Sequence, residues 1–409
     1  MKRILALILA ILMILCTFAA CDALAEPDSK DDKEQAEKET EKETKKELDW
    51  GDGDSSNNGD SSNNGGNSNE GGNSNEGGNS NNGGNSGFVS TDTYTREDNK
   101  ILFGSYPQTE VTDTALTSTL NGKAGTLPTS SNSQAWTSYG YYIEGEVSNF
   151  MWYIDVEEGD EKYRGVYFTS YRPYYAMYSS SADYSNQDDN GYTTGAVYWF
   201  KYEPISWTIL SENTTDGTAL ILCDMIIDSQ AYQDEYEYNS GYYYNTSDDV
   251  PEGTYANNYA YSTIRKWLNE MFYNTAFNAL QKALIVTTTV DNSTATTSSS
   301  SNPYACENTQ DKVFLLSYQD VINSNYGFSS NYSTYDTARR KKTTDYAQAQ
   351  GAYTYSGGSY DGNGSWWLRS PSDCDSGSVR GDNDSGPAYR SDLVYFTDYG
   401  VVPALQIRL

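Results

Sequence analysis

The side chains best suited to recognising a ligand gather near the C-terminus, between residues 372 and 399. This segment is rich in Asp, Ser, Gly, Tyr and Arg. In binding proteins, tyrosine supplies contact area at low entropic cost and short polar side chains supply adaptable hydrogen bonds. We therefore predict a ligand-binding face rather than a reaction centre. The candidate binding residues are Asp373, Cys374, Asp375, Ser376, Ser378, Arg380, Asp382, Asn383, Asp384, Ser385, Tyr389, Arg390, Ser391, Asp392 and Tyr395.

Three of these candidates, Tyr389, Arg390 and Tyr395, are of the types that dominate binding energy at interfaces. Carboxylate catalysis is the main alternative use of the segment. It needs two carboxylates held across a cleft, one of them with a raised pKa. Aspartates next to glycine in loops are more often solvated, so we predict no catalytic residue.

Metal and cofactor chemistry is not predicted either. The chain contains no histidine, which removes Ser-His and Cys-His nucleophile pairs and His-ligated zinc. The oxygens of residues 382–384 could hold calcium, but the pattern is too short to indicate a site.

Two apolar, proline-anchored segments, residues 366–371 and 400–405, flank the candidate segment and are predicted to hold it rigid. Successive residues of a strand point to opposite faces, so at least one of Trp366 and Trp367 is expected in the core. We expect Arg369 to form a structural, charge-assisted hydrogen bond beneath the ligand face.

The elements that must position the segment follow from hydrophobic periodicity. Residues 101–108 and 219–226 are predicted strands, and residues 197–200 and 205–209 an antiparallel pair that turns at Glu203-Pro204. Residues 313–316 are predicted as a further apolar strand. Residues 393–397 and 401–408 are predicted to form a final hairpin.

Two helices are predicted in the middle of the chain. Ser262 is positioned to cap the first, in which Ile264, Trp267, Leu268 and Phe272 share one face. The second is expected to begin at Asn274 or Thr275. With four long polar insertions, these elements predict an α+β fold with antiparallel strands.

The N-terminus predicts export. Residues 1–20 combine Lys2 and Arg3 with a short apolar run, as in a signal peptide, and Phe18-Ala19-Ala20-Cys21 resembles a bacterial lipobox. Lipidation of Cys21 would anchor the mature chain to a membrane, outside the cytoplasm and on the cell surface. Residues 21–87 are charged and then rich in Gly, Asn and Ser, so they predict a tether, and the folded domain is expected over 94–409.

The net charge of the chain restricts its binding partners, and its cysteine content bears on disulfide formation. A formal net charge of −30 argues against nucleic acid as a partner. The expected partner is a protein or a glycan at the cell surface. Outside the predicted leader and Cys21 the chain has Cys223, Cys306 and Cys374, and a bridge between the last two is not expected.

The chain resembles an uncharacterised bacterial extracytoplasmic domain that is common in surface lipoproteins. The motifs that carry the resemblance are Phe103-Gly104-Ser105-Tyr106-Pro107-Gln108, Pro204-Ile205-Ser206-Trp207, residues 262–269, 272–277 and 311–317, Trp367-Leu368-Arg369-Ser370-Pro371 and Gly400-Val401-Val402-Pro403-Ala404-Leu405. The family usually has Arg where Val402 stands. The resemblance implies a C-type-lectin-like or formylglycine-generating-enzyme-like fold, with the two terminal motifs framing a ligand face.

Some proteins of that fold are diversified by retroelements that randomise adenines in a C-terminal segment. Changing the adenines of an Asn codon never yields Lys, Glu, Gln, Met or Trp, and residues 370–405 contain none of these five. A plain polar β-meander would look the same, so both interpretations stay open. Three functions follow: a surface ligand-binding protein, which we favour, a secreted carboxylate-dependent hydrolase, and a structural adhesion module of the cell envelope.

Overall fold

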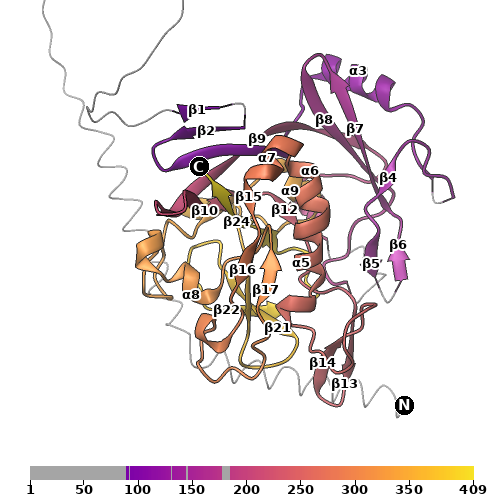
Figure 1. Ribbon diagram of the computed structural model, residues 1–409. Helices are drawn as coiled ribbons and strands as arrows, with labels where there is room; N and C mark the ends of the chain where they lie inside the picture. Colours follow the sequence, from indigo (N-terminus) through magenta and orange to yellow (C-terminus); the bar gives the residue numbers. More distant parts are fainter. Residues whose placement is uncertain (1–88, 92, 130, 144–145, 177–184) are drawn as a thin grey trace, which may run out of the picture. The chain divides into compact units, whose positions relative to one another are not determined.

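The computed structural model describes residues 89–91, 93–129, 131–143, 146–176 and 185–409 (Figure 1). The predicted signal peptide, Cys21 and the whole predicted tether lie outside these residues. Residues 87–409 form one compact unit. Within the described residues, no helix is long and apolar enough to cross a membrane.

The largest sheet is built around one 17-residue strand, β9 (Val197–Asn213). Along one side of β9 runs β3 (Lys100–Glu110), while β8 (Glu161–Phe168) and β10 (Thr218–Cys223) share the other side, all antiparallel to it. The sheet is completed by β1 (Val89–Ser90), β2 (Tyr94–Glu97), β4 (Thr137–Ser138), β7 (Met151–Glu158), β15 (Ile285–Val286) and β24 (Ala404–Arg408). The predicted strand over 101–108 is therefore confirmed. The strand predicted over 219–226 is confirmed only as far as Cys223, because Met225–Ile226 (β11) belong to another sheet.

The predicted turn at Glu203-Pro204 is wrong, because β9 continues through it. Pro204 lies opposite Ser105, where the register between β3 and β9 shifts. A bulge of this kind tolerates a residue that cannot donate a ladder hydrogen bond. Gln108 adds a side-chain link, since its Nε2 donates to the carbonyl oxygen of Glu203 at 3.0 Å and that of Pro204 at 3.2 Å.

A second sheet of five strands carries the C-terminal segment. Its strands, in spatial order, are β12 (Asp228–Ser229), β23 (Gly400–Val401), β20 (Trp366–Pro371), β21 (Ser378–Asp382) and β22 (Arg390–Leu393). The predicted final hairpin is wrong. β22 pairs with β21, while β24 pairs with β10 and β15 in the large sheet, so the two apolar runs end up in different sheets.

Four smaller sheets complete the strands. They are β5 (Tyr141–Ile143) with β6 (Glu146–Ser148), β13 (Tyr236–Asn239) with β14 (Tyr242–Asn245), β16 (Thr288–Val290) with β17 (Thr309–Asp311), and β11 (Met225–Ile226) with β18 (Lys341–Thr343) and β19 (Asn363–Gly364). Residues 313–316 are buried as predicted but form only an isolated bridge, between Phe314 and Ala404.

The helices are short. They are α3 (Thr114–Ala124), α4 (Asn186–Asp189), α5 (Thr263–Trp267), the π-helical η2 (Leu268–Phe272), α6 (Tyr273–Ala276), α7 (Ala279–Leu284), α8 (Tyr318–Val321) and α9 (Asp345–Ala349), with 3₁₀ turns η1 (Tyr259–Tyr261), η3 (Thr294–Thr296), η4 (Ser324–Tyr326) and η5 (Gly358–Tyr360). Together with the sheets they make a mixed α+β fold of mostly antiparallel strands, as predicted.

The first predicted helix is confirmed. Ser262 caps α5 by accepting a hydrogen bond from the backbone N–H of Arg265 at 3.4 Å, and the helix runs through η2 into α6. The predicted start of the second helix is wrong. Asn278 caps α7 in a capping box with Gln281, and Phe277 is a buried linker whose ring centre lies 5.1 Å from that of Phe103.

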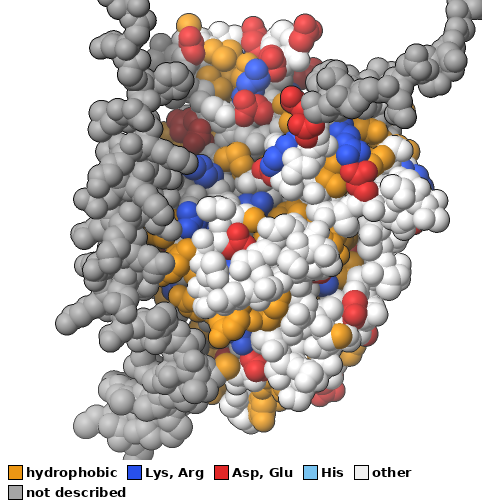
Figure 2. Space-filling model, turned by 90° about the vertical axis from the view of Figure 1, so that its left-hand side faces the viewer, with side chains coloured by type: hydrophobic (Ala, Val, Ile, Leu, Met, Phe, Trp, Pro, Cys, Tyr) orange, Lys and Arg blue, Asp and Glu red, His pale blue; other side chains and the backbone are white. Residues whose placement is uncertain are grey.

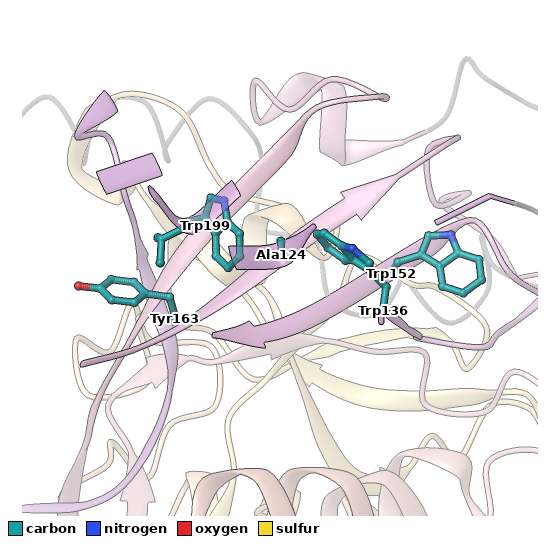
Figure 3. Close-up of a cluster of buried hydrophobic side chains, with 6 residues drawn as sticks. Ala124, Trp136, Trp152, Tyr163 and Trp199 are labelled. Atoms are coloured by element: carbon teal, nitrogen blue, oxygen red, sulfur yellow. The ribbon is translucent and has the colours of Figure 1, made fainter. Parts of the chain in front are cut away.

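Aromatic side chains make up much of the core. One cluster joins Trp136, Trp152, Tyr163 and Trp199 with Leu120 and Ala124 of α3 (Figure 3). Each of these side chains is at most 6% exposed. The large sheet is thereby held on one side by α3, which lies against its β7 and β9 strands.

Candidate ligand-binding face

The frame of the candidate segment is buried, as predicted. Trp366 and Trp367 are both fully buried, and each indole N–H is paired, with the carbonyl oxygen of Arg339 at 3.1 Å and of Gln230 at 2.9 Å. The ring of Trp367 stacks on that of Tyr399 with centres 4.1 Å apart. Both tryptophans are therefore core residues and are closed to a ligand.

Arg369 forms the structural bonds that were predicted. Its side chain is 6% exposed and its Nη1 donates to Oδ2 of Asp320 and to the carbonyl oxygen of Leu315, both at 2.8 Å. Nε and Nη2 donate to the carbonyl oxygen of Asp291 at 3.3 and 3.2 Å. Val402, where the resembling family usually has Arg, is fully buried.

Four of the candidate binding residues are buried supports rather than surface groups. Ser376 Oγ accepts from the backbone N–H of Tyr243 at 2.7 Å, and Ser378 Oγ donates to Oδ2 of Asp375 at 2.8 Å. Tyr395 is 8% exposed within a cluster of rings, and Asp382 is fully buried. The interpretation of these four as ligand contacts is corrected, because their side chains face the interior.

The remaining candidates do not form a single surface. On β21 and β22, Arg380 lies opposite Ser391, and Gly381 lies opposite Arg390. Because strand side chains alternate, Arg380 and Ser391 belong to one face of the small sheet while Arg390 and Asp392 belong to the other. The face with Arg380 is called here the Arg380 face, and the other the Arg390 face.

On the Arg380 face the charges are paired internally. Arg380 Nη2 donates to Oδ1 of Asp373 at 2.7 Å and to Oγ of Ser298 at 3.0 Å, and its Nη1 donates to the carbonyl oxygen of Tyr389 at 3.1 Å. Its side chain is only 15% exposed. This guanidinium therefore fixes the turn at Asp373 and offers little to a ligand.

The Arg390 face is more open. The Arg390 side chain is 47% exposed, and its Nε lies 3.8 Å from Oδ2 of Asp392. The Tyr399 hydroxyl donates to the same Asp392 oxygen. Tyr399 raises the pKa of Arg390 most strongly, and Asp392 and Asp384 raise it further. An exposed cation thus sits among carboxylates and phenol groups.

Asp398 lies beneath this face. Its residue is 4% exposed, and burial raises the pKa of its carboxyl group to about 7, with a further contribution from the charge of Asp392. A hydrogen bond to Tyr174 favours the ionised form. Within the described part of the chain, Asp398 Oδ1 has no hydrogen-bond partner. A buried carboxyl group with a raised pKa thus lies close to the carboxyl group of Asp392.

The other candidates surround this face or lie in its connecting loops. Asp384 is half-buried, and burial raises the pKa of its carboxyl group while Arg390 lowers it. Two side chains fix the backbone of the loop that contains Asp384. Arg340 Nε donates to the carbonyl oxygen of Ser385 at 3.0 Å, and Asn363 Nδ2 donates to the carbonyl oxygen of Asp384 at 3.0 Å. Asn383, Ser385 and Tyr389 are half-buried, Asp375 is half-buried, and Cys374 is exposed.

A bridge between Cys306 and Cys374 is absent, in agreement with the prediction. Cys306 and Cys223 are free thiols. Burial raises the pKa of Cys223 to about 12 and that of Cys306 to about 11, so neither is a ready nucleophile.

Sequence reasoning missed Tyr174, Tyr353 and Tyr399 as members of the Arg390 face. Tyr353 is 37% exposed, and its backbone N–H donates to the carbonyl oxygen of Asp398 at 2.8 Å. Tyr174 and Tyr353 lie in two of the four long polar insertions of the sequence. Those insertions were the only available signal, since neither tyrosine lies in a recognisable motif.

Two cavities lie elsewhere, and neither is lined by a candidate binding residue. The larger, of about 610 Å³, is lined by polar and charged side chains that include Arg265, Lys266 and Asp248. The smaller, of about 290 Å³, is lined by residues that include Lys100, Arg340 and Lys341. In the described ranges of the chain, no group of three or more Cys, Asp or Glu side chains could hold a metal ion.

Residues 216–409 match a family described as Domain of unknown function (DUF6273). The match agrees with the expected uncharacterised domain family and covers the whole C-terminal segment. No curated protein and no solved structure matches the chain.

Proposed function

We propose that this chain is a lipid-anchored, surface-displayed protein that binds an extracellular protein or glycan through the Arg390 face. The observation that carries the proposal is an exposed guanidinium on β22 with a carboxylate beside it on the same strand. A second carboxylate, Asp384, and an exposed tyrosine, Tyr353, come from loops around this strand, and the sheet is supported by fully buried tryptophans. Such a face offers stacking and charge-assisted hydrogen bonds at little entropic cost, because its support is already rigid.

The proposal includes a C-type-lectin-like fold, anchoring through Cys21 and diversification of the C-terminal segment. Diversification is supported where side chains reach the surface, as at Asp384, Arg390 and Asp392. It is opposed at Ser376, Ser378 and Asp382, where replacement would disturb the interior. Randomising the first group should change partner choice with little loss of stability, whereas randomising the second should unfold the domain.

The binding test compares variants on one ligand. The full chain is screened on arrays of glycans and of cell-surface proteins, and the strongest binder is titrated against Arg390→Ala, Tyr353→Ala and the control Lys201→Ala. Lys201 has similar side-chain exposure, 38%, but lies on β9 of the large sheet. We expect the first two variants to lose about tenfold or more in affinity and the control to keep it. Equal affinity of all four proteins would contradict the assignment of this face.

Anchoring is tested separately. Expressed with a clickable palmitate analogue, the wild-type chain should incorporate label and the Cys21→Ser variant should not. Label that is absent from both, or equal in both, would exclude Cys21 as the lipid attachment site.

A hydrolase is the second candidate, favoured by one observation, the raised pKa of the buried Asp398 carboxyl group beside Asp392. Neither of the two cavities described above is lined by this pair. The test is hydrolysis of polysaccharide and peptide libraries by wild type and by Asp398→Asn, and turnover lost in the variant would favour an enzyme. A structural adhesion module remains the third proposal, and binding to an envelope component that survives Arg390→Ala would favour it.

A further inference from the structure

The smaller cavity lies between the large sheet and the segment that follows η4. Its floor is one row across three strands, because Lys100 of β3 lies opposite Thr208 of β9, and Thr208 lies opposite Leu222 of β10. Its other wall includes Phe328 and Lys341. The volume, about 290 Å³, is that of a site for a small molecule.

Lys341 is the unusual member of this wall. The residue is 5% exposed, and its ammonium group donates to the carbonyl oxygen of Cys223 at 3.0 Å. An ammonium group carries three donors, and within the described residues Lys341 forms no ion pair. Burial lowers the pKa of Lys341, while the charge of Asp224 raises it. A buried ammonium of this kind gains from any anion that enters the cavity.

The neighbouring charges do not supply that anion. The carboxylate of Asp224 already accepts hydrogen bonds from Lys100, at 2.6 Å, and from Ser206 and Thr208. Asp382 acts on Lys341 only weakly, and its own carboxyl group already faces a cation, because Arg339 Nε lies 4.0 Å from its Oδ1.

Arg340 adds a second cation whose charge is not neutralised nearby. Its guanidinium donates to carbonyl oxygens, that of Ser385 at 3.0 Å and that of Tyr335 at 3.2 Å. Lys100, Arg340 and Lys341 against Asp224 leave the cavity positive in a chain of formal net charge −30. Figure 2 shows Lys and Arg side chains scattered among Asp and Glu side chains on the face that it presents.

We propose that this cavity binds a small organic anion, with its carboxylate or phosphate group at Lys341 and an apolar part against Leu222 and Phe328. Leu222 is 1% exposed and Phe328 is 4% exposed, so the apolar wall is already formed. The site is separate from the Arg390 face and does not depend on the function proposed for that face.

The experiment is calorimetric titration of the full chain with benzoate, with its neutral isostere benzamide, and with inorganic phosphate. Benzoate should bind saturably and about tenfold or more tightly than benzamide. Phosphate binding more tightly than benzoate would identify the group as phosphate rather than carboxylate. The idea fails when neither anion binds saturably up to about 10 mM.

Variants locate the site. Lys341→Met should weaken anion binding about tenfold or more, while Lys342→Met should leave it unchanged. Lys342 is the next residue of β18, exposed, with its amine bonded to the carbonyl oxygen of Asp361 at 3.3 Å. Should Lys341→Met not fold, Lys100→Met at the half-exposed rim must weaken binding several-fold. Unchanged affinity in the folded pocket variants would overturn the assignment.

Discussion

Replacing Asp398 by Asn should remove a pH-dependent penalty on the stability of the fold. The pKa of Asp398 is raised from 3.8 to about 7, chiefly by burial and then by the charge of Asp392. A carboxyl group with a raised folded-state pKa holds its proton more tightly in the folded chain than in the unfolded one. Its contribution to stability is complete below its ordinary pKa and is lost as the pH rises through about 7.

The magnitude follows from the shift. About three pKa units correspond to about 4 kcal/mol at 1.36 kcal/mol per unit, of which about 3 kcal/mol is lost between pH 5 and pH 8. Asn cannot ionise but has nearly the shape of the protonated acid. The Asp398→Asn variant should therefore match the wild type at pH 5 and exceed it by about 3 kcal/mol at pH 8.

The assay is urea unfolding of both proteins at pH 5, 6, 7 and 8, followed by tryptophan fluorescence. Other carboxyl groups, among them those of the buried Asp382 and the half-buried Asp384, also have raised pKa values and should tilt both curves in the same direction. The difference between the two curves isolates Asp398. Parallel curves, or a variant that is less stable at pH 8, would refute the reasoning.

Two further predictions concern the frame. Arg369→Ala should lower the free energy of unfolding by about 3 kcal/mol, the lower end for a broken buried pair because Asp320 is 24% exposed, and should lower Tm by about 4 °C. In the same calorimetric scans, Arg390→Ala should stay within about 0.5 kcal/mol of wild type. Equal effects of the two substitutions would contradict the structural role of Arg369. In thermal unfolding, Gly386→Ala should destabilise the protein more than Gly357→Ala. Both glycines have positive φ, but a Cβ at Gly386 would lie 2.4 Å from the carbonyl oxygen of Asp336, whereas a Cβ at Gly357 would meet nothing within 4 Å. Equal losses of stability would show that only the backbone conformation matters.

The sequence was most informative where chemistry is local. The buried frame around Trp366 and Trp367 follows from its composition, and the cap at Ser262 follows from a short polar residue before an apolar stripe. The bonds of Arg369 were predictable because a guanidinium between buried residues needs acceptors. Each of these inferences concerns whether a residue is inside or what its immediate neighbours require.

Partners distant in the chain could not be predicted. Periodicity indicated that residues near 205 and 401 are extended, but it does not identify the strand beside them, so β9 was divided at Pro204 and β24 was assigned to the wrong hairpin. For the same reason the candidate list missed Tyr174 and Tyr353. The alternation of β21 and β22, which separates Arg380 from Arg390, became visible only with the register.

The family match begins at residue 216, in the turn between β9 and β10, although β10 pairs with β9 across that boundary. If residues 216–409 were produced alone, β10 would lose β9 as its neighbour, and a row of its backbone donors and acceptors would be unpaired. Unprotected strand edges of that kind invite pairing between molecules. A shortened form of the protein that is meant to stay soluble should therefore retain the preceding strands from β1 onward.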